Sequence, residues 1–494
     1  MPHATSPGSS PPAMEDTVMS EAVPNQETEQ ATLPQSKTNI DDMFDDDESA
    51  SDDEFSSSAP QKSSQSDAPS IPQTIKASDP DTLLSFYSRL FPFRPLFQWL
   101  NAGPNPSQQF TNREFAFVLP NDAYIRYQSF ATGDLLRKQC LQMTPVRFEI
   151  GPQYSLNPRD RKSVRKQGAF RPVAKELVFD IDMTDYDEIR TCCSKANICP
   201  KCWEFMTVAI KVLDRALRED FGFKHLLWVY SGRRGVHCWV SDRRARTMDD
   251  STRKAVAGYM ELLRGGGQGQ KKVNIRRPLH PHIDRSLSLL NPHFANLLQT
   301  QDPFLTPQQS TRLLSLIPDS TLTTALQKKW DSQPSRSSTQ KWADIDALAS
   351  AGNISITPRA LADCKQDIRL EYTYPRLDAE VSKKLNHLLK SPFVVHPGTG
   401  RVCVPIDPAK PEEFDPFSVP TVQTLLEEID QWSQENTDPE GRVHDWQKTS
   451  LKPYVERFKA FVDVLVKDET ADRKRSREDE GGAAAAAAAE GIEF

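Results

Sequence analysis

The sequence lacks a long apolar run, a secretory leader and a disulfide framework. Nowhere do about 18 apolar residues follow one another, so we expect no transmembrane helix. Residues 1–18 contain no basic stretch followed by an apolar core, so we expect no secretory signal. Cysteine is scarce, with eight in 494 residues, and four of them crowd into residues 192–202. That clustering is typical of an intracellular metal site and not of extracellular disulfides.

Positive charge is almost absent from the first 78 residues. They hold 15 Asp and Glu against three Lys, a net charge of −12. Since the whole chain carries −7, residues 79–494 carry +5, and this weakly basic body suits a phosphate-rich partner. Residues 1–78 are also rich in Ser, Pro and Gln and poor in aromatics, which predicts a disordered acidic tail. The tail is either merely solvating or contains a docking motif around Phe44 and Phe55.

Hydrophobic periodicity predicts alternating helices and strands from residue 79 to residue 468. Residues 300–350 are polar and helical, and we interpret them as a small helical insertion. Residues 469–494 are predicted to be a second disordered tail, whose Arg-Lys-Arg-Ser-Arg run is either a nuclear import signal or a solvated charge run. The patterns predict a hairpin over 114–130, a helix over 203–220, strand–turn–strand over 225–242, strands over 368–378 and 401–407, and an amphipathic helix over 453–466.

Two aspartates interrupt an apolar run that predicts a buried strand. Asp180 and Asp182 lie two residues apart in this run, and side chains with that spacing on a strand point to the same face. Burying two like charges costs several kcal/mol unless a positive charge neutralises them. Carboxylate oxygens are the ligands that Mg²⁺ and Mn²⁺ prefer. The pattern therefore indicates a divalent metal site, and a solvent-exposed strand end is the alternative.

The cysteine cluster has the composition of a zinc site. It consists of Cys192, Cys193, Cys199 and Cys202, of which the last two form the Cys-x₂-Cys pair of zinc motifs. Four thiolates would close a tetrahedral site with no open position, so we expect a structural zinc. A redox-active cysteine pair is the alternative.

A Gly-bounded basic turn is expected between the two strands of residues 225–242. It brings together Ser231, Arg233, Arg234 and His237. Guanidinium groups donate forked, charge-assisted hydrogen bonds to phosphate oxygens, so this turn suits a triphosphate. An ordinary exposed basic turn is the alternative.

Residues 375–407 contain four further candidates. Asp378 is a candidate third metal ligand, followed by a predicted helix that carries His387 and Lys390 and then by His396 ahead of a Pro-Gly-Thr-Gly turn. The alternatives are a helix cap for Asp378 and a plain surface residue for Lys390.

In this order, the motifs resemble the small, catalytic subunit of eukaryotic DNA primases, in the archaeo-eukaryotic primase family. The resemblance extends from about residue 80 to residue 465. The blocks that carry it are REFAFVLPNDAYIRYQSF at 113–130, KELVFDIDMTDYDEIRTCC at 175–193, ICPKCW at 198–203, SGRRGVHCWVSD at 231–242 and the segment 375–407.

The resemblance implies an α/β (α+β) primase catalytic fold, with mixed sheets flanked by helices, a structural zinc motif and a small helical subdomain. Its catalytic domain would comprise residues 79–299, with the zinc motif at 192–202, and residues 351–468. The helical subdomain would be residues 300–350, and the two disordered tails would lie outside the resemblance.

The resemblance also implies roles for individual residues. Three carboxylates would hold two catalytic Mg²⁺ or Mn²⁺ ions: Asp180, Asp182 and Asp378. Glu114 and Arg126 match residues of the family's active-site region. The remaining positions would bind the incoming nucleotide: Ser231, Arg233, Arg234, His237, His387, Lys390 and His396. Zinc would be bound by Cys192, Cys193, Cys199 and Cys202.

The function implied is DNA-templated synthesis of short RNA primers from ribonucleoside triphosphates (NTPs), for the initiation of DNA replication. The partners implied are a primase large subunit, the catalytic and accessory subunits of DNA polymerase alpha, and a single-stranded DNA template, in the nucleus and without a membrane. One alternative is a related polymerase that uses deoxynucleotides in repair. Another is a catalytically silent zinc-bearing nucleic-acid binder, against which the three intact aspartates argue.

Overall fold

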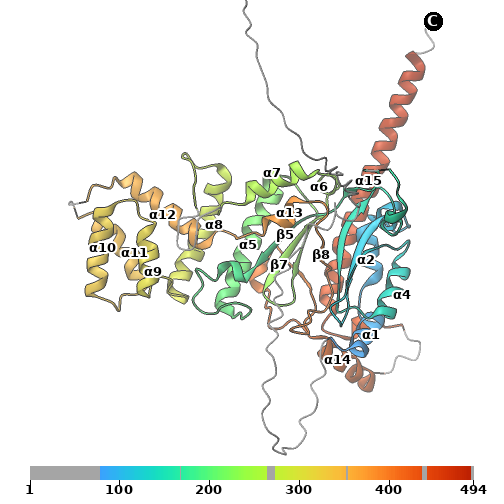
Figure 1. Cartoon of the computed structure of the whole chain (residues 1–494), viewed down its shortest axis with the longest axis horizontal. Coiled ribbons are helices and arrows are strands. Elements are labelled where there is room, and N and C mark those ends of the chain that lie inside the picture. The colour runs from blue at the N-terminus through green and yellow to red at the C-terminus, as the bar shows by residue number, and fades with distance from the viewer. Residues whose placement is uncertain (1–77, 167, 264–272, 352–353, 437–441, 491–494) are drawn as a thin grey trace, which may run out of the picture. The chain divides into compact units, whose positions relative to one another are not determined.

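The structure, a computed structural model, describes residues 78–490 apart from 167, 264–272, 352–353 and 437–441 (Figure 1). The predicted acidic tail, up to residue 77, and residues 491–494 lie outside the described residues. Within the described part of the chain, no helix has both the length and the apolar character needed to cross a membrane.

An antiparallel sheet occupies the N-terminal part of the described chain. Its strands are β1 (Arg113–Val118), β2 (Tyr124–Gln128), β3 (Arg147–Tyr154), β4 (Pro172–Ala174) and β8 (Leu389–Lys390). The order is β2-β1-β3-β4, and β8 pairs with β3. The helices of this part are α1 (Pro80–Arg89), α2 (Phe93–Asn101), α3 (Gln108–Thr111) and α4 (Gly133–Met143), with the 3₁₀ helix η2 (Pro158–Ser163) between β3 and β4. The antiparallel pair β1–β2 confirms the predicted hairpin.

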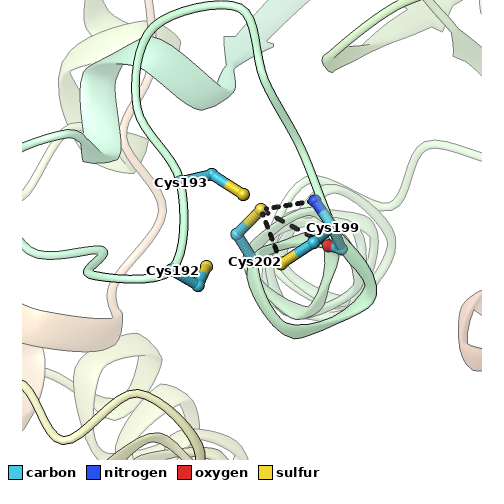
Figure 2. A group of neighbouring side chains, drawn as sticks. All are labelled: Cys192, Cys193, Cys199 and Cys202. Carbon is cyan, nitrogen blue, oxygen red and sulfur yellow. Dashed lines mark hydrogen bonds between the residues drawn. The ribbon is translucent and has the colours of Figure 1, made fainter.

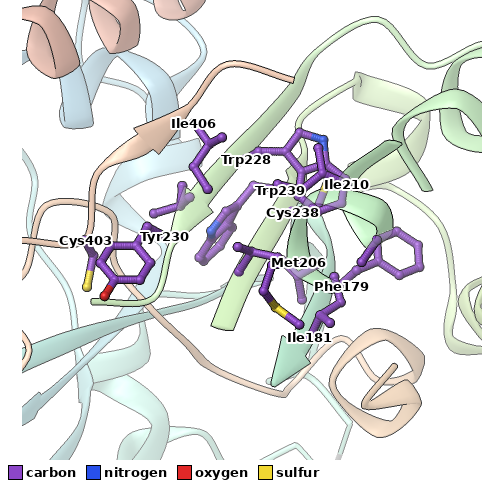
Figure 3. Close-up of a cluster of buried hydrophobic side chains, with 14 of the residues drawn as sticks. Phe179, Ile181, Met206, Ile210, Trp228, Tyr230, Cys238, Trp239, Cys403 and Ile406 are labelled. Carbon is purple, nitrogen blue, oxygen red and sulfur yellow. The ribbon is translucent and has the colours of Figure 1, made fainter. Parts of the chain in front are cut away.

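A second antiparallel sheet carries the two aspartates. Its strands are β5 (Leu177–Asp182), β6 (Leu226–Tyr230), β7 (Gly235–Val240) and β9 (Pro405–Ile406), in the order β5-β7-β6-β9. Phe179 lies opposite Cys238, and Cys238 lies opposite Trp228, so these three side chains share one face. That face packs on α5 (Pro200–Glu219), as Figure 3 shows, and the Trp228 indole donates a hydrogen bond to Asp214 of α5.

The opposite face of this sheet carries the polar residues. Asp180 lies opposite His237 and Asp182 lies opposite Gly235 in the β5–β7 ladder. Because successive side chains of a strand alternate between faces, burying Phe179 and Ile181 against α5 forces both aspartates to the other side. The strand, the turn and the helix predicted for this region are therefore confirmed.

The helical region begins after β7. It comprises α6 (Arg243–Arg246), α7 (Asp250–Met260), α8 (Pro281–Thr300), α9 (Pro307–Ser315), α10 (Ser320–Ser332), α11 (Ser338–Ala349) and α12 (Pro358–Thr373). Helices α9, α10 and α11 fall within residues 300–350, as predicted. That these residues form a separate subdomain stays a prediction.

The strand predicted over residues 368–378 is wrong, because α12 continues to Thr373. Thr357 caps this helix and Pro358 occupies its first turn, which are strong helix-start signals. Near its end, Ile368 and Tyr372 pack into the main core while Leu370 packs into a smaller second cluster. A helix buried on two sides has apolar residues at short spacings, and this imitates the alternation of a strand.

The segment that carries His387 and Lys390 also differs from the prediction. Helix α13 (Ala379–Lys383) ends before both residues, so His387 lies in a loop and Lys390 lies on β8. The backbone of Lys390 pairs with Glu149 of β3, so its hydrogen-bonding groups are not available to a longer helix. Only two residues of the predicted strand 401–407 form β9, with an isolated bridge between Val395 and Val402 before it.

The C-terminal elements are η4 (Pro411–Glu413), α14 (Val422–Glu435), η5 (Asp445–Lys448) and α15 (Lys452–Glu490). Helix α15 confirms the predicted amphipathic helix, with Phe458, Val462 and Leu465 buried. It also continues through residues 469–490, where a disordered tail was predicted. A salt bridge between Lys474 and Glu478, four residues apart, and the run of alanines both favour helix in this part.

Gly235→Ala tests how tightly β7 approaches β5. A Cβ atom at this position would lie 2.5 Å from the carbonyl oxygen of Ile181, which is backbone and cannot give way cheaply. We expect the substitution to lower the free energy of unfolding by about 1–3 kcal/mol, measured by denaturant titration. Gly103→Ala is the control, because its Cβ would meet nothing closer than 3.8 Å. Equal stability of the two variants would contradict the close approach.

Candidate active site

The three predicted catalytic aspartates lie together at the end of β5. The backbone N–H of Asp378 donates to the carbonyl oxygen of Asp180 at 3.1 Å, in an isolated antiparallel bridge between the two residues. Asp182 ends the strand and caps the 3₁₀ helix η3 (Met183–Tyr186), accepting hydrogen bonds from Thr184 at 2.8 and 2.7 Å. Asp378 caps α13 by accepting from the N–H of Glu380. Two separate chain segments thus meet at one carboxylate cluster.

The cluster is electrostatically unfavourable as it stands. Desolvation, with the charges of Asp182 and Asp378, raises the pKa of Asp180 to about 7, although its side chain keeps 27% exposure. A fourth carboxylate, which the sequence analysis missed, also belongs here. Desolvation, with Asp182 and Asp378, raises the pKa of Asp185 to about 6. Its position three residues after Asp182 was the available signal. Carboxylates that raise one another's pKa in this way are suitable ligands for a hard divalent cation.

Ser231 and Gly232 fix the conformation of the basic turn between β6 and β7. Ser231 Oγ accepts a hydrogen bond from the Gly235 N–H at 3.0 Å, which closes the turn. Gly232 has φ of +90°, and a Cβ there would lie 2.6 Å from Cβ of His396. Only glycine fits this position, so the turn and the loop that carries His396 pack directly on each other.

Two side chains from β7 and its turn face the carboxylates. Arg234 Nε lies 2.8 Å from both carboxylate oxygens of Asp182. His237 Nε2 lies 3.5 Å from Asp180 Oδ1, and the His237 ring is almost fully buried. The antiparallel register explains both contacts, since it places His237 directly opposite Asp180 and Gly235 opposite Asp182.

The remaining candidates with basic side chains lie in the same turn or in segments that contact it. Lys390 Nζ donates to the carbonyl oxygen of Ser231 at 3.4 Å, and its charge acts to lower the pKa of Asp180. Arg233 lies beside Gly398 in the Pro-Gly-Thr-Gly turn, and the N–H of Gly398 donates to the ring Nδ1 of His396. His387 differs from these residues in its surroundings: its carbonyl oxygen accepts a hydrogen bond from the fully buried Lys175.

Glu114 and Arg126 form a neighbouring group on the first sheet. Glu114 is fully buried on β1 and accepts hydrogen bonds from Arg126 Nε at 3.0 Å and from the Tyr127 N–H at 3.1 Å. The hydroxyl of Tyr154 is a third donor, at 3.0 Å. Glu114 thus holds Arg126 in place. A catalytic role for Glu114 stays a prediction.

One short segment connects this group with the carboxylates. A Cβ on Gly151 would lie 3.1 Å from Glu114 and 3.2 Å from Leu388, so Leu388 packs beside the Glu114 group. Two residues later, Lys390 reaches Ser231. Residues 388–390 therefore run from the Glu114 group to the basic turn.

The four predicted zinc ligands converge (Figure 2). The sulfur atoms of Cys192, Cys193, Cys199 and Cys202 all lie within 4.8 Å of one another. Cys199 caps the N-terminus of α5, and its N–H donates to Cys202 Sγ at 3.1 Å. Burial opposes the ionisation of Cys199, but hydrogen bonds from the Cys202 backbone and from neighbouring thiols lower its pKa to about 7. Four sulfur donors at this spacing fit a tetrahedral zinc ion, which prefers thiolates.

Comparison with known proteins agrees with this geometry. Residues 179–408 match the family model described as DNA primase small subunit. The chain is 52% identical to the DNA primase small subunit of Schizosaccharomyces pombe over 424 residues, which cover 81% of this chain and 93% of that protein. It is 42% identical to the Saccharomyces cerevisiae DNA primase small subunit, covering 80% and 94%, and 40% identical to that of Drosophila melanogaster, covering 78% and 91%.

The chain therefore belongs to the DNA primase small subunit family, with the function of a DNA primase catalytic subunit in replication.

Proposed function

We propose that the chain synthesises short RNA primers from NTPs on a single-stranded DNA template, and that the carboxylate cluster and the basic turn carry this reaction. One observation supports the proposal above all others. Asp180, Asp182 and Asp378, joined through backbone and strand register, face the cationic groups of Arg234 and Lys390. Nucleotidyl transfer needs this pairing, because metal ligands and phosphate-binding cations must lie side by side.

The three carboxylates would hold two divalent cations, Mg²⁺ or Mn²⁺. When bound, such a pair supplies a lowered pKa for the attacking 3′-hydroxyl and charge neutralisation for the departing pyrophosphate. The residues themselves would position the carboxylates that hold the cations. The backbone bond from Asp378 to Asp180 fixes the distance between two carboxylates that come from different segments, and the Thr184 hydrogen bonds orient Asp182.

The basic groups would bind and orient the triphosphate. Arg233, Arg234 and Lys390 surround one turn, so together they offer a cationic cradle for β- and γ-phosphate oxygens. Arg234 has a second role, because it already holds Asp182. Ser231, His237 and His396 would shape the cradle through the contacts described above. Arg126, held by Glu114 on the first sheet, would supply a further cation. For His387 the sequence resemblance alone supports a nucleotide contact.

Zinc at the four cysteines would be structural. Two of the ligands lie in the loop between η3 and α5, and the other two lie at the start of α5. Helix α5 covers the apolar face of the second sheet. A zinc ion there would tie the chain that follows Asp182 to the helix behind β5.

We further propose a heterodimer with a primase large subunit, assembled with the catalytic and accessory subunits of DNA polymerase alpha in the nucleus. The family membership of the chain as a small subunit supports this assembly.

Asp180→Asn and Asp182→Asn test the metal site. Each should reduce primer synthesis roughly a thousandfold or more, because catalytic cations contribute several kcal/mol to the transition state. Synthesis is measured on single-stranded DNA with radiolabelled NTPs, with and without Mg²⁺ or Mn²⁺, and with deoxynucleotides in parallel. Asp463→Asn, on the exposed side of α15, is the control and should retain full activity. Retained synthesis in the Asp180 variant would contradict the assignment, and a preference for deoxynucleotides would favour a repair polymerase.

Arg233→Ala and Arg234→Ala should differ in their kinetic effects. Loss of a charged hydrogen bond to phosphate, about 1.5–3 kcal/mol, should raise the apparent KM for NTP about tenfold or more in both variants. Arg234→Ala should also lower kcat, because Asp182 loses the guanidinium that orients it. Steady-state primer extension measures both constants. Identical effects of the two substitutions would contradict the double role of Arg234.

Cys199→Ser tests the zinc site. Loss of one of four thiolates should release the metal and lower the free energy of unfolding by several kcal/mol, since metal binding is coupled to folding. Zinc content is measured by atomic emission and stability by thermal unfolding. Cys364→Ser is the control, because Cys364 is buried on α12 away from the cluster and should leave the zinc content unchanged. Stoichiometric zinc in the Cys199 variant would show that the ligand set is different.

A further inference from the structure

A strongly basic segment connects β3 with β4. Residues 157–171 contain six Lys and Arg and one Asp, a net charge of +5. This equals the net charge of the whole of residues 79–494, which is also +5. Outside this basic segment, the positive and negative charges of the body therefore balance. These 15 residues thus carry as much net positive charge as the whole body.

Five of the six cations of the basic segment are exposed and form no ion pair with a described carboxylate. Arg159, Lys162, Arg165, Lys166 and Arg171 are all exposed to solvent. Among the residues that the structure describes, none of these five forms an ion pair with a carboxylate. Elsewhere on the surface, arginines such as Arg215 and Arg218 pair with an acid one helical turn away. Five unneutralised cations in one short segment point to an anionic partner with several charges.

Aromatic rings of β2 and of the chain just after it fix the basic segment. The guanidinium of Arg161 lies 4.2 Å from the ring centre of Tyr127, and that of Arg159 lies 5.0 Å from the ring centre of Phe130. Asn157 accepts a hydrogen bond from Ser129 at 2.6 Å. When a guanidinium stacks on the face of a ring, its N–H groups point outward in its own plane and can still donate hydrogen bonds to phosphate oxygens. The start of the basic segment is therefore anchored, with Arg161 held on β2 and Arg159 on the chain just after it.

The row of cations continues into the active site. The Tyr127 ring that contacts Arg161 is also 4.9 Å from the guanidinium of Arg126. The Tyr127 N–H donates to Glu114, which holds Arg126. The aromatic stack of Phe170 on Tyr154, 4.2 Å between ring centres, joins the far end of the basic segment to the same carboxylate, since Tyr154 donates to Glu114.

We propose that the six cations of the basic segment bind the phosphate backbone of the single-stranded template and guide it past Arg126 toward the carboxylate cluster. This inference rests on the proposed function and adds the surface on which the template lies. A single strand fits because it presents successive phosphates along a flexible chain, and proteins bind it through basic tracks interspersed with aromatic residues. A lone nucleotide would engage only a small part of so extended a row.

The triple variant K162Q/R165Q/K166Q tests the basic segment. These residues are exposed and lie outside the catalytic and nucleotide-binding sets, so the fold and the nucleotide KM should not change. The affinity of the full chain for a fluorescein-labelled oligodeoxythymidine is measured by anisotropy over a salt series. Each lost phosphate contact removes about 0.7 from the slope of log affinity against log salt, so the slope should fall by about 2.

Two control triple variants separate the effect of the position of the charges from the effect of their number. K162R/R165K/K166R keeps the charges in the basic segment and should keep the slope. R94Q/K138Q/K328Q removes the same kinds of charge from exposed positions on α2, α4 and α10 and should also keep it. An unchanged slope in K162Q/R165Q/K166Q would overturn the proposal. Tighter binding by that variant would overturn it too, as expected if the segment instead bound the acidic residues 1–77 of the same chain. Binding is measured without nucleotide, so its outcome is independent of whether the Asp180 variant loses synthesis.

Discussion

A buried ion pair joins the two sheets, and the geometry of the site depends on it. Arg113, at the start of β1, donates to both carboxylate oxygens of Glu176 at 2.7 and 3.0 Å, and both side chains are only 1% exposed. Burial opposes ionisation of Glu176, but Arg113 holds its pKa below the usual value. Breaking such a pair typically costs about 3–5 kcal/mol, because a charge is left unpaired in the core. Glu176 directly precedes β5, so this pair fixes where the strand of Asp180 begins.

Other buried cations extend this junction to the surrounding helices. Arg253 of α7 donates to the carbonyl oxygens of Lys175 and Glu176, and Arg246 of α6 pairs with Glu469 of α15. Lys175 is itself fully buried, and desolvation together with the charge of Arg253 lowers its pKa to about 7. Because its ammonium group donates to the carbonyl oxygen of His387, the same junction also places the segment that ends at Lys390. Neither sheet could shift relative to the other without breaking these bonds.

The candidate site therefore draws on both sheets and on strand β8 between them. The second sheet supplies the carboxylates and the basic turn, whose register and glycines leave little freedom. The first sheet supplies the Glu114 group and, through the aromatic rings beside it, the basic segment of residues 157–171. Strand β8 belongs to the first sheet by its hydrogen bonds and to the site by Lys390. A template held on one sheet and a nucleotide held on the other would meet along this strand.

The sequence by itself determined the local elements and the chemistry. Period-two patterning placed Asp180 and Asp182 on one face, and cysteine spacing picked out the four sulfur donors that the structure draws together. What only the tertiary structure decided depends on contacts between distant segments. The end of helix α12 was predicted as a strand because it is buried on two sides. Strand β8 was predicted as part of a helix because its partner β3 lies far away in the sequence. Arg234 looked like a pure phosphate ligand until the β5–β7 register placed it on Asp182. The surroundings of Asp185 and of the cations of residues 157–171 became known only from the structure. A local sequence pattern carries no information on which faces of distant segments meet.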